Sequence, residues 1–237
     1  MKTLLLRLAA PLQSWGDESM FDNRGTWPEP SKSGVVGLLS AALGRSRDED
    51  ISDLNRLYFG VRVDQPGSYL VDYHTAKPTP YKGKDSNVTR RTYIQDAVFL
   101  AGLEGDFELL NTIQKALKSP CFPLFLGRKS CPPTMPLLLG IRDCDLKTAL
   151  KNEPWLAAEH FKKDSRNKNY CAKICVDTKP DERKKYVQWD VPVSFSRSNK
   201  SWFFRGVSTS QTLFNTEQTD ENNSNTEHNP LIDLQED

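Results

Sequence analysis

The N-terminal stretch constrains the fold most, because a short apolar run is followed, after a polar loop, by a capped apolar helix. Residues Thr3–Leu8 are almost wholly apolar and precede Pro11, which is typical of a buried strand. Ser31 and Ser33 are both suitable N-cap residues for a helix over Gly34–Leu43, whose apolar residues recur at helical spacing. The backbone N–H groups and the dipole at the first turn of this helix would also suit a phosphate. An ordinary β–α unit with a well-capped helix explains the same residues.

The elements expected up to residue 141 follow the order β-α-β-β-α-β. Their second helix begins after the capping residue Asp106 and ends before Pro120. This order is typical of a ferredoxin-like domain, the α+β arrangement that RNA-recognition folds also use. The expected strands are Thr3–Leu8, Tyr58–Val63, Tyr93–Leu103 and Met135–Ile141, with a short extra helix near Glu49–Leu57.

The chain divides into a ferredoxin-like domain over residues 1–141, a small β-rich region over 142–210 and an acidic tail over 211–237. The tail is rich in Asn, Thr and Glu, so we expect it to be disordered. A polar stretch over about 65–92 interrupts the first domain. The β-rich region is expected to contain a small helix near Leu146–Lys151 and strands near Tyr170–Val176, Tyr186–Phe195 and Trp202–Val207.

The net charge of +1 hides a strong asymmetry along the chain. Residues 211–237 hold seven of the 31 acidic residues and no Lys or Arg, which leaves 32 basic against 24 acidic residues before them. A basic body is typical of a protein that binds a polyanion. The tail either is a solvated end without a function or competes with nucleic acid for the basic face.

Composition also limits the cofactors and the compartment. The five cysteines lack CxxC spacing, which favours reduced thiols over disulfides or a zinc site, and we expect neither a metal nor a cofactor. No apolar run approaches the roughly 20 residues that span a bilayer. Met1 and Lys2 precede leucines, but Arg7 interrupts the run, so a secretion signal is not expected. These features predict a cytoplasmic protein.

The polar stretch over 65–92 combines cations with aromatic side chains. A loop of this length inside a compact domain is usually functional or disordered. Cations hold the backbone of single-stranded RNA and rings stack on its bases, so the composition favours RNA binding. A mobile, solubilising loop is the alternative. The candidates in and next to this stretch are Tyr73, His74, Arg90, Arg91 and Tyr93.

A second candidate site follows the expected second helix. Gly127 permits close backbone approach, and Arg128, Lys129 and Ser130 provide two cations and a hydroxyl. These residues predict a phosphate cradle, although any basic turn has a similar composition. The proline pair Pro132–Pro133 stiffens its exit.

Catalytic patterns are poor. The chain has neither a Walker A loop nor a GxSxG motif, and Asp72 and Asp96 do not form a recognisable two-metal set. His74 could act as the base in a metal-independent RNA cleavage. A histidine in such a stretch more often stacks or forms hydrogen bonds, so binding is favoured over catalysis.

Four segments in order resemble the CasD family, the fifth-family subunit of type I-E CRISPR Cascade in the RAMP superfamily. Leu6–Gly16 resembles the N-terminal signature of that family. Ser33–Gly44, Asp72–Thr75 and Leu126–Pro132 support the match, which extends over roughly residues 3–207. The acidic tail has no counterpart in this pattern.

The resemblance implies a ferredoxin-like domain with a β-hairpin thumb at about residues 65–92. It implies a non-catalytic subunit that caps the repeat-derived 5′ handle of the crRNA, contacts the backbone and large Cascade subunits, and meets target DNA only through the complex. A repeat-cleaving endoribonuclease and an RNA-independent adaptor are the alternatives. The residues expected to bind RNA are Gln13, Trp15, Arg24, Ser31, Lys32, Ser33, Tyr73, His74, Arg90, Arg91, Tyr93, Arg128, Lys129 and Ser130.

Overall fold

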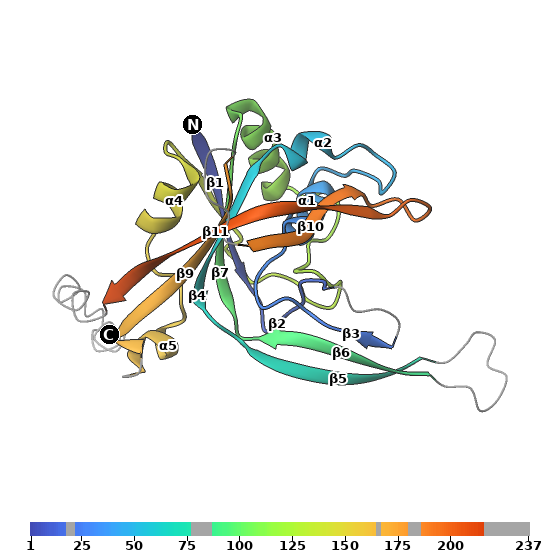
Figure 1. Cartoon of the computed structure of the whole chain (residues 1–237), viewed down its shortest axis with the longest axis horizontal. Helices are drawn as coiled ribbons and strands as arrows, with labels where there is room; N and C mark the ends of the chain where they lie inside the picture. Colours follow the sequence, from blue (N-terminus) through green and yellow to red (C-terminus); the bar gives the residue numbers. More distant parts are fainter. Residues whose placement is uncertain (18–21, 77–86, 165–166, 180–185, 216–237) are drawn as a thin grey trace, which may run out of the picture.

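A seven-stranded antiparallel sheet forms the centre of the molecule (Figure 1). The computed structural model describes residues 1–17, 22–76, 87–164, 167–179 and 186–215. The order of strands across the sheet is β10-β11-β9-β4-β7-β1-β8. These strands are β1 (Lys2–Ala9), β4 (Tyr58–Gln65), β7 (Val98–Gly105), β8 (Leu138–Arg142), β9 (Asn169–Asp177), β10 (Tyr186–Ser194) and β11 (Ser201–Asn215).

Helices cover both faces of this sheet. Side chains alternate along a strand, so Leu4 and Leu6 of β1 lie on one face and Leu5 on the other, and all three are fully buried. Leu4 and Leu6 belong to the larger core with α1 and α3, whereas Leu5 packs with α4 in a second core. The helices are α1 (Lys32–Ala42), α2 (Ser52–Asn55), α3 (Phe107–Lys118), α4 (Leu146–Asn152) and α5 (Glu159–Lys163).

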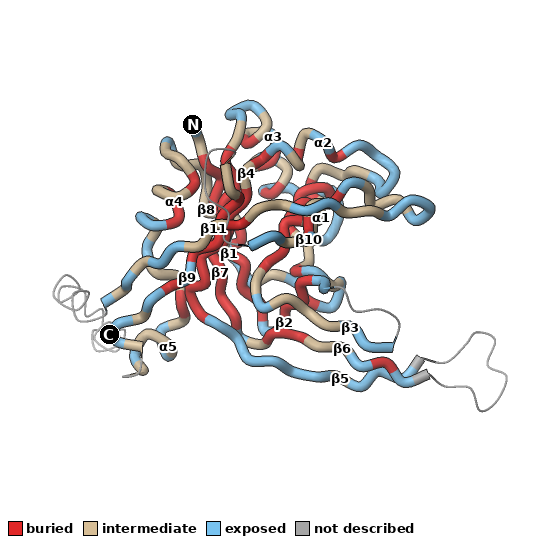
Figure 2. Tube along the Cα trace, in the orientation of Figure 1, coloured by how far each residue is buried: buried red, intermediate tan, exposed pale blue. Residues whose placement is uncertain are grey.

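A smaller sheet extends away from the main one. Its long strands, β5 (Ser68–Ala76) and β6 (Asn87–Gln95), pair antiparallel, and the short strands β2 (Leu12–Gln13) and β3 (Asn23–Arg24) both pair with β6. Figure 1 shows β5 and β6 projecting beyond the body of the protein. Figure 2 shows buried residues concentrated in the central sheet and exposed ones along β5.

The predicted α+β class is confirmed, with three differences from the residue pattern in its elements. The stretch over 65–92, which the residue pattern indicated as a polar loop and the family resemblance as a β-hairpin, contains β5 and most of β6; residues 77–86 lie outside the described part. The strand predicted over Tyr93–Leu103 is two strands, because the chain turns at Asp96, whose φ is +57°. Helix α5 and the short strands β2 and β3 were not predicted, since too few residues form them to give a periodic pattern.

The division at residue 142 does not correspond to a separate sheet. β9 pairs with β4, so the C-terminal strands extend the sheet that β1 begins. The predicted start of the tail at residue 211 is wrong, because Gln211–Asn215 form the end of β11 and pair with β9. The remainder of the predicted tail, 216–237, lies outside the described residues. Within the described residues, no helix is long and apolar enough to cross a membrane.

Candidate nucleic-acid interface

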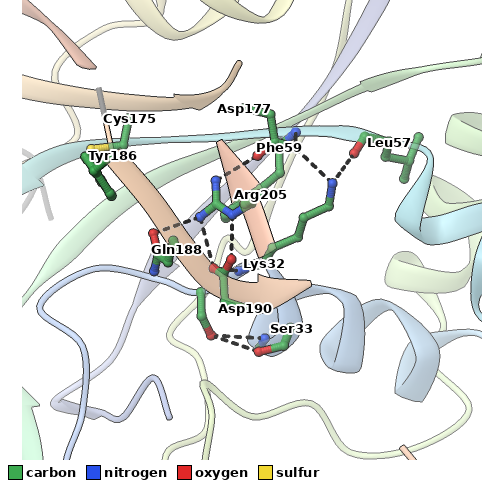
Figure 3. Close-up of polar contacts among 12 residues, drawn as sticks. Lys32, Ser33, Leu57, Phe59, Cys175, Asp177, Tyr186, Gln188, Asp190 and Arg205 are labelled. Carbon is green, nitrogen blue, oxygen red and sulfur yellow. Dashed lines mark hydrogen bonds and ion pairs between the residues drawn. The ribbon is translucent and has the colours of Figure 1, made fainter. Parts of the chain in front are cut away.

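The first residue of α1, Lys32, is held in a buried network of charged groups (Figure 3). The Lys32 ammonium donates to the carbonyl oxygen of Leu57 and to Oδ2 of Asp177, each at 2.8 Å. Its backbone N–H donates to Oδ2 of Asp190, also at 2.8 Å. Ser31 caps the helix by accepting from the Gly34 N–H. The expectation that Lys32 contacts a phosphate is therefore corrected, because its ammonium and its backbone N–H are already bound inside the protein.

Arg205 joins the two carboxylates of this network, and sequence reasoning missed all three residues. Its guanidinium donates to Asp190 through Nε at 2.6 Å and to Asp177 through Nη1 at 2.7 Å. Burial lowers the pKa of Arg205, but the hydrogen bonds and charges of Asp190 and Asp177 outweigh this, so the net pKa is raised. Asp177, Asp190 and Arg205 all lie more than 140 positions from Lys32 in the sequence, so no local pattern could have connected them with it.

Gln13 and Trp15 are also structural. Both side chains are fully buried, and the Trp15 indole N–H donates to Oε1 of Gln13 at 3.2 Å. The amide of Gln13 donates in turn to the carbonyl oxygen of Ala97 at 2.7 Å. Gly34 leaves room for the Trp15 ring, since a Cβ at this position would lie 2.8 Å from it. The predicted RNA-binding wall beside the first helix is therefore corrected for these residues as well.

Three predicted arginines lie on neighbouring segments of the chain, and we call them the arginine cluster: Arg24 on β3, Arg91 on β6, and Arg128 in the loop after α3. Arg24 lies beside Arg91 in the parallel pairing of β3 with β6. Arg128 donates to the carbonyl oxygens of Thr92 at 3.1 Å and of Arg24 at 2.8 Å. Arg91 Nε is buried and has no hydrogen-bond partner among the described residues. The cluster therefore brings three cationic residues to neighbouring segments, and Asp72 lies opposite Arg91 across β5 and β6.

Tyr93 contacts the arginine cluster through Arg128. Its ring is buried, and the Arg128 guanidinium carbon lies 4.6 Å from the ring centroid. Gly127 has a φ of +83°, and a Cβ there would lie 1.4 Å from the carbonyl oxygen of Ser14, so this position requires glycine. The loop that begins at Gly127 therefore lies close against the N-terminal segment. Lys129 and Ser130, which follow Arg128, are exposed.

The opposite face of the hairpin carries exposed rings. We call Tyr69, Val71, Tyr73 and Arg90 the exposed hairpin face, because strand alternation and the pairing of Tyr73 with Arg90 place them together. The Arg90 guanidinium lies 5.6 Å from the centre of the Tyr73 ring. Sequence reasoning missed Tyr69 and Val71; their spacing of two and four residues from Tyr73, which puts all three on one face of a strand, is the signal that could have found them.

His74 lies on the same face as the arginine cluster and not on the exposed hairpin face. Its Nδ1 is 4.0 Å from Oδ2 of Asp72, and both side chains are about half exposed. This pair attracts only when the histidine is protonated. In the described part of the chain, no group of three or more His, Cys, Asp and Glu side chains is arranged to hold a metal ion.

The sequence matches the model of a family described as "CRISPR-associated protein (Cas_Cas5)" over residues 3–206. The chain belongs to this Cas5 family. The curated relative "CRISPR system Cascade subunit CasD" of Escherichia coli (strain K12) is 35% identical over 183 residues, which cover 68% of this chain and 81% of the relative.

Solved structures also resemble this Cas5 chain. A chain of a structure described as "CRISPR RNA-guided surveillance complex" matches with a TM-score of 0.76 and 32% identity, covering 91% of this chain and 92% of its own. A second, described as "Crystal structure of Cas protein", matches with a TM-score of 0.66 and 40% identity over 88% of this chain and 94% of its own. The α+β fold is therefore that of known Cas proteins.

Proposed function

We propose that this chain is a non-catalytic subunit of a Cascade-type CRISPR surveillance complex that binds and caps the repeat-derived 5′ handle of the crRNA. In this role it contacts the backbone and large subunits, and reaches target DNA only through the complex. The curated Cascade relative and the similar chain from a surveillance complex support membership of such an assembly. The arginine cluster supports binding of RNA.

The arginine cluster carries this proposal. Three arginines lie on neighbouring segments here, and a guanidinium group binds phosphate through two parallel hydrogen bonds. The rings of Tyr69 and Tyr73 on the other face are exposed and can stack on unpaired bases. Arg90, next to Tyr73 on that face, adds a cation beside the rings, which is the combination that proteins use to bind single-stranded RNA.

The topology supports an interpretation of the hairpin as the thumb of a ferredoxin-like domain. Four strands of the central sheet lie in the order β4-β7-β1-β8, with α1 between β1 and β4 along the chain and α3 between β7 and β8. β5 and β6 lie between β4 and β7 in the sequence, where the thumb is expected. In this interpretation, the domain supplies the rigid base and the hairpin supplies the RNA contacts.

The proposal is tested by isolating the tagged full chain from its native host and sequencing the RNA that accompanies it. We expect RNAs of uniform length that share one repeat-derived 5′ end, together with several other proteins. The chain alone, or random RNA fragments, would contradict the proposal. Cleavage of repeat RNA by the purified chain alone would favour the endoribonuclease alternative.

Replacing Arg24 and Arg91 together by Gln tests the arginine cluster directly. Phosphate contacts release counterions, so the slope of log affinity against log salt should become smaller by about 1.4 if each arginine binds one phosphate of a single strand. The measurement is the dissociation constant for the recovered RNA at several salt concentrations. Lys115→Gln with Lys118→Gln, on α3 and far from β3 in Figure 1, is the matched control. Equal slopes for both variants would overturn the assignment.

A further inference from the structure

A pocket of about 320 Å³ lies at the base of the hairpin, where the smaller sheet leaves the main one. Tyr69 and Ile94, which pair across β5 and β6, line it together with Val63 of β4 and Pro66. A pocket of this size, mostly apolar and with few polar groups, is typical of sites for small ligands or single chemical groups.

One side of the pocket carries an ion pair. Lys173 of β9 donates to Oε1 of Glu29, and the thiol of Cys175 donates to Oε2 of the same carboxylate at 3.3 Å. Burial lowers the pKa of Lys173, but its hydrogen bond with Glu29 contributes to a net raised pKa, which keeps the amine protonated. The pocket therefore offers a cationic donor and an anionic acceptor side by side.

Tyr69 connects the pocket to the surface of the hairpin. Its side chain is 61% exposed, so most of the ring is open to solvent although the residue lines the pocket. Tyr69 is also the first member of the exposed hairpin face, followed by Val71 and Tyr73 along β5. A strand of RNA on this face would reach the pocket at its inner end.

We propose that the pocket receives one unpaired base of the RNA, with Tyr69 as the stacking surface and the Glu29–Lys173 pair at the edge of the base. This inference rests on the proposed function, because it assumes RNA on the hairpin. A nucleobase presents hydrogen-bond donors and acceptors next to one another on its edge, and its faces are apolar, so it matches an apolar pocket with a paired carboxylate and amine. An aliphatic side chain of a protein partner would leave that ion pair without new partners.

Cys171 provides a direct probe, because it lines the pocket and is exposed. Alkylation of the full chain by iodoacetamide, followed by peptide mass mapping, measures each thiol separately. With a synthetic copy of the recovered RNA at ten times its dissociation constant, alkylation of Cys171 should slow by about tenfold. Cys121, which is exposed outside the pocket, is the internal control and should react at an unchanged rate. Burial raises the pKa of the Cys175 thiol to about 11, so this neighbour reacts slowly in both samples.

Abasic scanning distinguishes a base in the pocket from RNA that only covers it. RNAs that lack one base at a time are compared between the wild type and Tyr69→Ala. We expect one position at which loss of the base weakens binding roughly tenfold in the wild type and much less in the variant. Phe122→Ala, which removes an exposed ring outside the pocket, is the matched control and should respond like the wild type.

The outcomes separate the two proposals. If neither protein binds the RNA, the proposed function fails. If the RNA binds but Cys171 reacts as fast as before, or no base position depends on Tyr69, the pocket assignment is overturned while the proposed function stands. Protection of Cys171 together with one position coupled to Tyr69 supports the pocket.

Discussion

Lys32 shows how a residue with the right chemistry for phosphate binding can be taken up by the protein interior. Its position in the first turn of α1, next to Ser31 and Ser33, suggests an anion site when only the sequence is considered. In the structure its ammonium is almost completely buried and paired with Asp177. The local pattern was identified correctly, but its function depends on carboxylates from β9 and β10 that the pattern does not contain.

Replacing Lys32 by Met should therefore affect stability rather than RNA binding. The change leaves the buried Asp177 with Arg205 as its remaining cationic partner, and breaking a buried ion pair in this way costs about 3 kcal/mol. Urea unfolding of the full chain measures the difference. The matched control is Lys129→Met, at an exposed lysine, which should leave the free energy of unfolding unchanged within about 0.5 kcal/mol. Equal unfolding midpoints for the two variants would show that the buried pair contributes nothing.

The residue pattern alone indicated a polar loop over 65–92, and only the family resemblance implied the hairpin that β5 and β6 form. Polar residues occur on both of its faces, so Ser68–Ala76 lacks the alternation of buried and exposed positions that reveals a strand packed on a core. By contrast, α3 has a clear apolar face and the expected cap at Asp106, and was predicted to within one residue at its start. Strands held by pairing rather than by a buried face leave the weakest signal in a sequence.

Arg128 joins the hairpin strand β6 to β3 through its hydrogen bonds to both. We therefore expect Arg128→Lys to weaken the attachment of β3. A lysine offers a point charge and cannot reach the carbonyl oxygens of Thr92, Arg24 and Gly25 with one planar group. We expect a local loss of about 1–2 kcal/mol, seen as roughly tenfold faster amide hydrogen exchange over residues 22–27. Exchange in β7 should be unchanged, and Lys129→Ala should have no effect in either place. Unaltered exchange over 22–27 in the Arg128 variant would contradict this role.

At the scale of the whole molecule, one continuous sheet joins the two ends of the chain. Apart from β2, β3 and the hairpin strands, the order of elements up to residue 142 could be predicted from local periodicity and from capping residues such as Asp106. The addition of β9, β10 and β11 to the same sheet could not, because it depends on pairing between β4 and β9, which are about 110 residues apart. The predicted boundary after residue 141 therefore divides strands that belong to one sheet.

Two truncated chains test this arrangement. A chain ending at Ser210 lacks the last five residues of β11 and the Phe214 ring, which stacks on Trp155 at 5.5 Å. It should be destabilised by about 2 kcal/mol. A chain ending at Asn215 keeps all of the described residues and should unfold at the same urea concentration as the full chain. If both truncations behave alike, the end of β11 is not part of the stable fold.

The buried network at Lys32 also has a consequence for synthesis on the ribosome. The lysine emerges early, but Asp177, its partner, is made 145 residues later, and Arg205 later still. Until then the growing chain has no internal carboxylate from β9 for this charge, and α1 cannot settle into its final contacts. Because contacts between residues so far apart slow folding, completion of the native state has to wait until almost the whole described chain has left the exit tunnel.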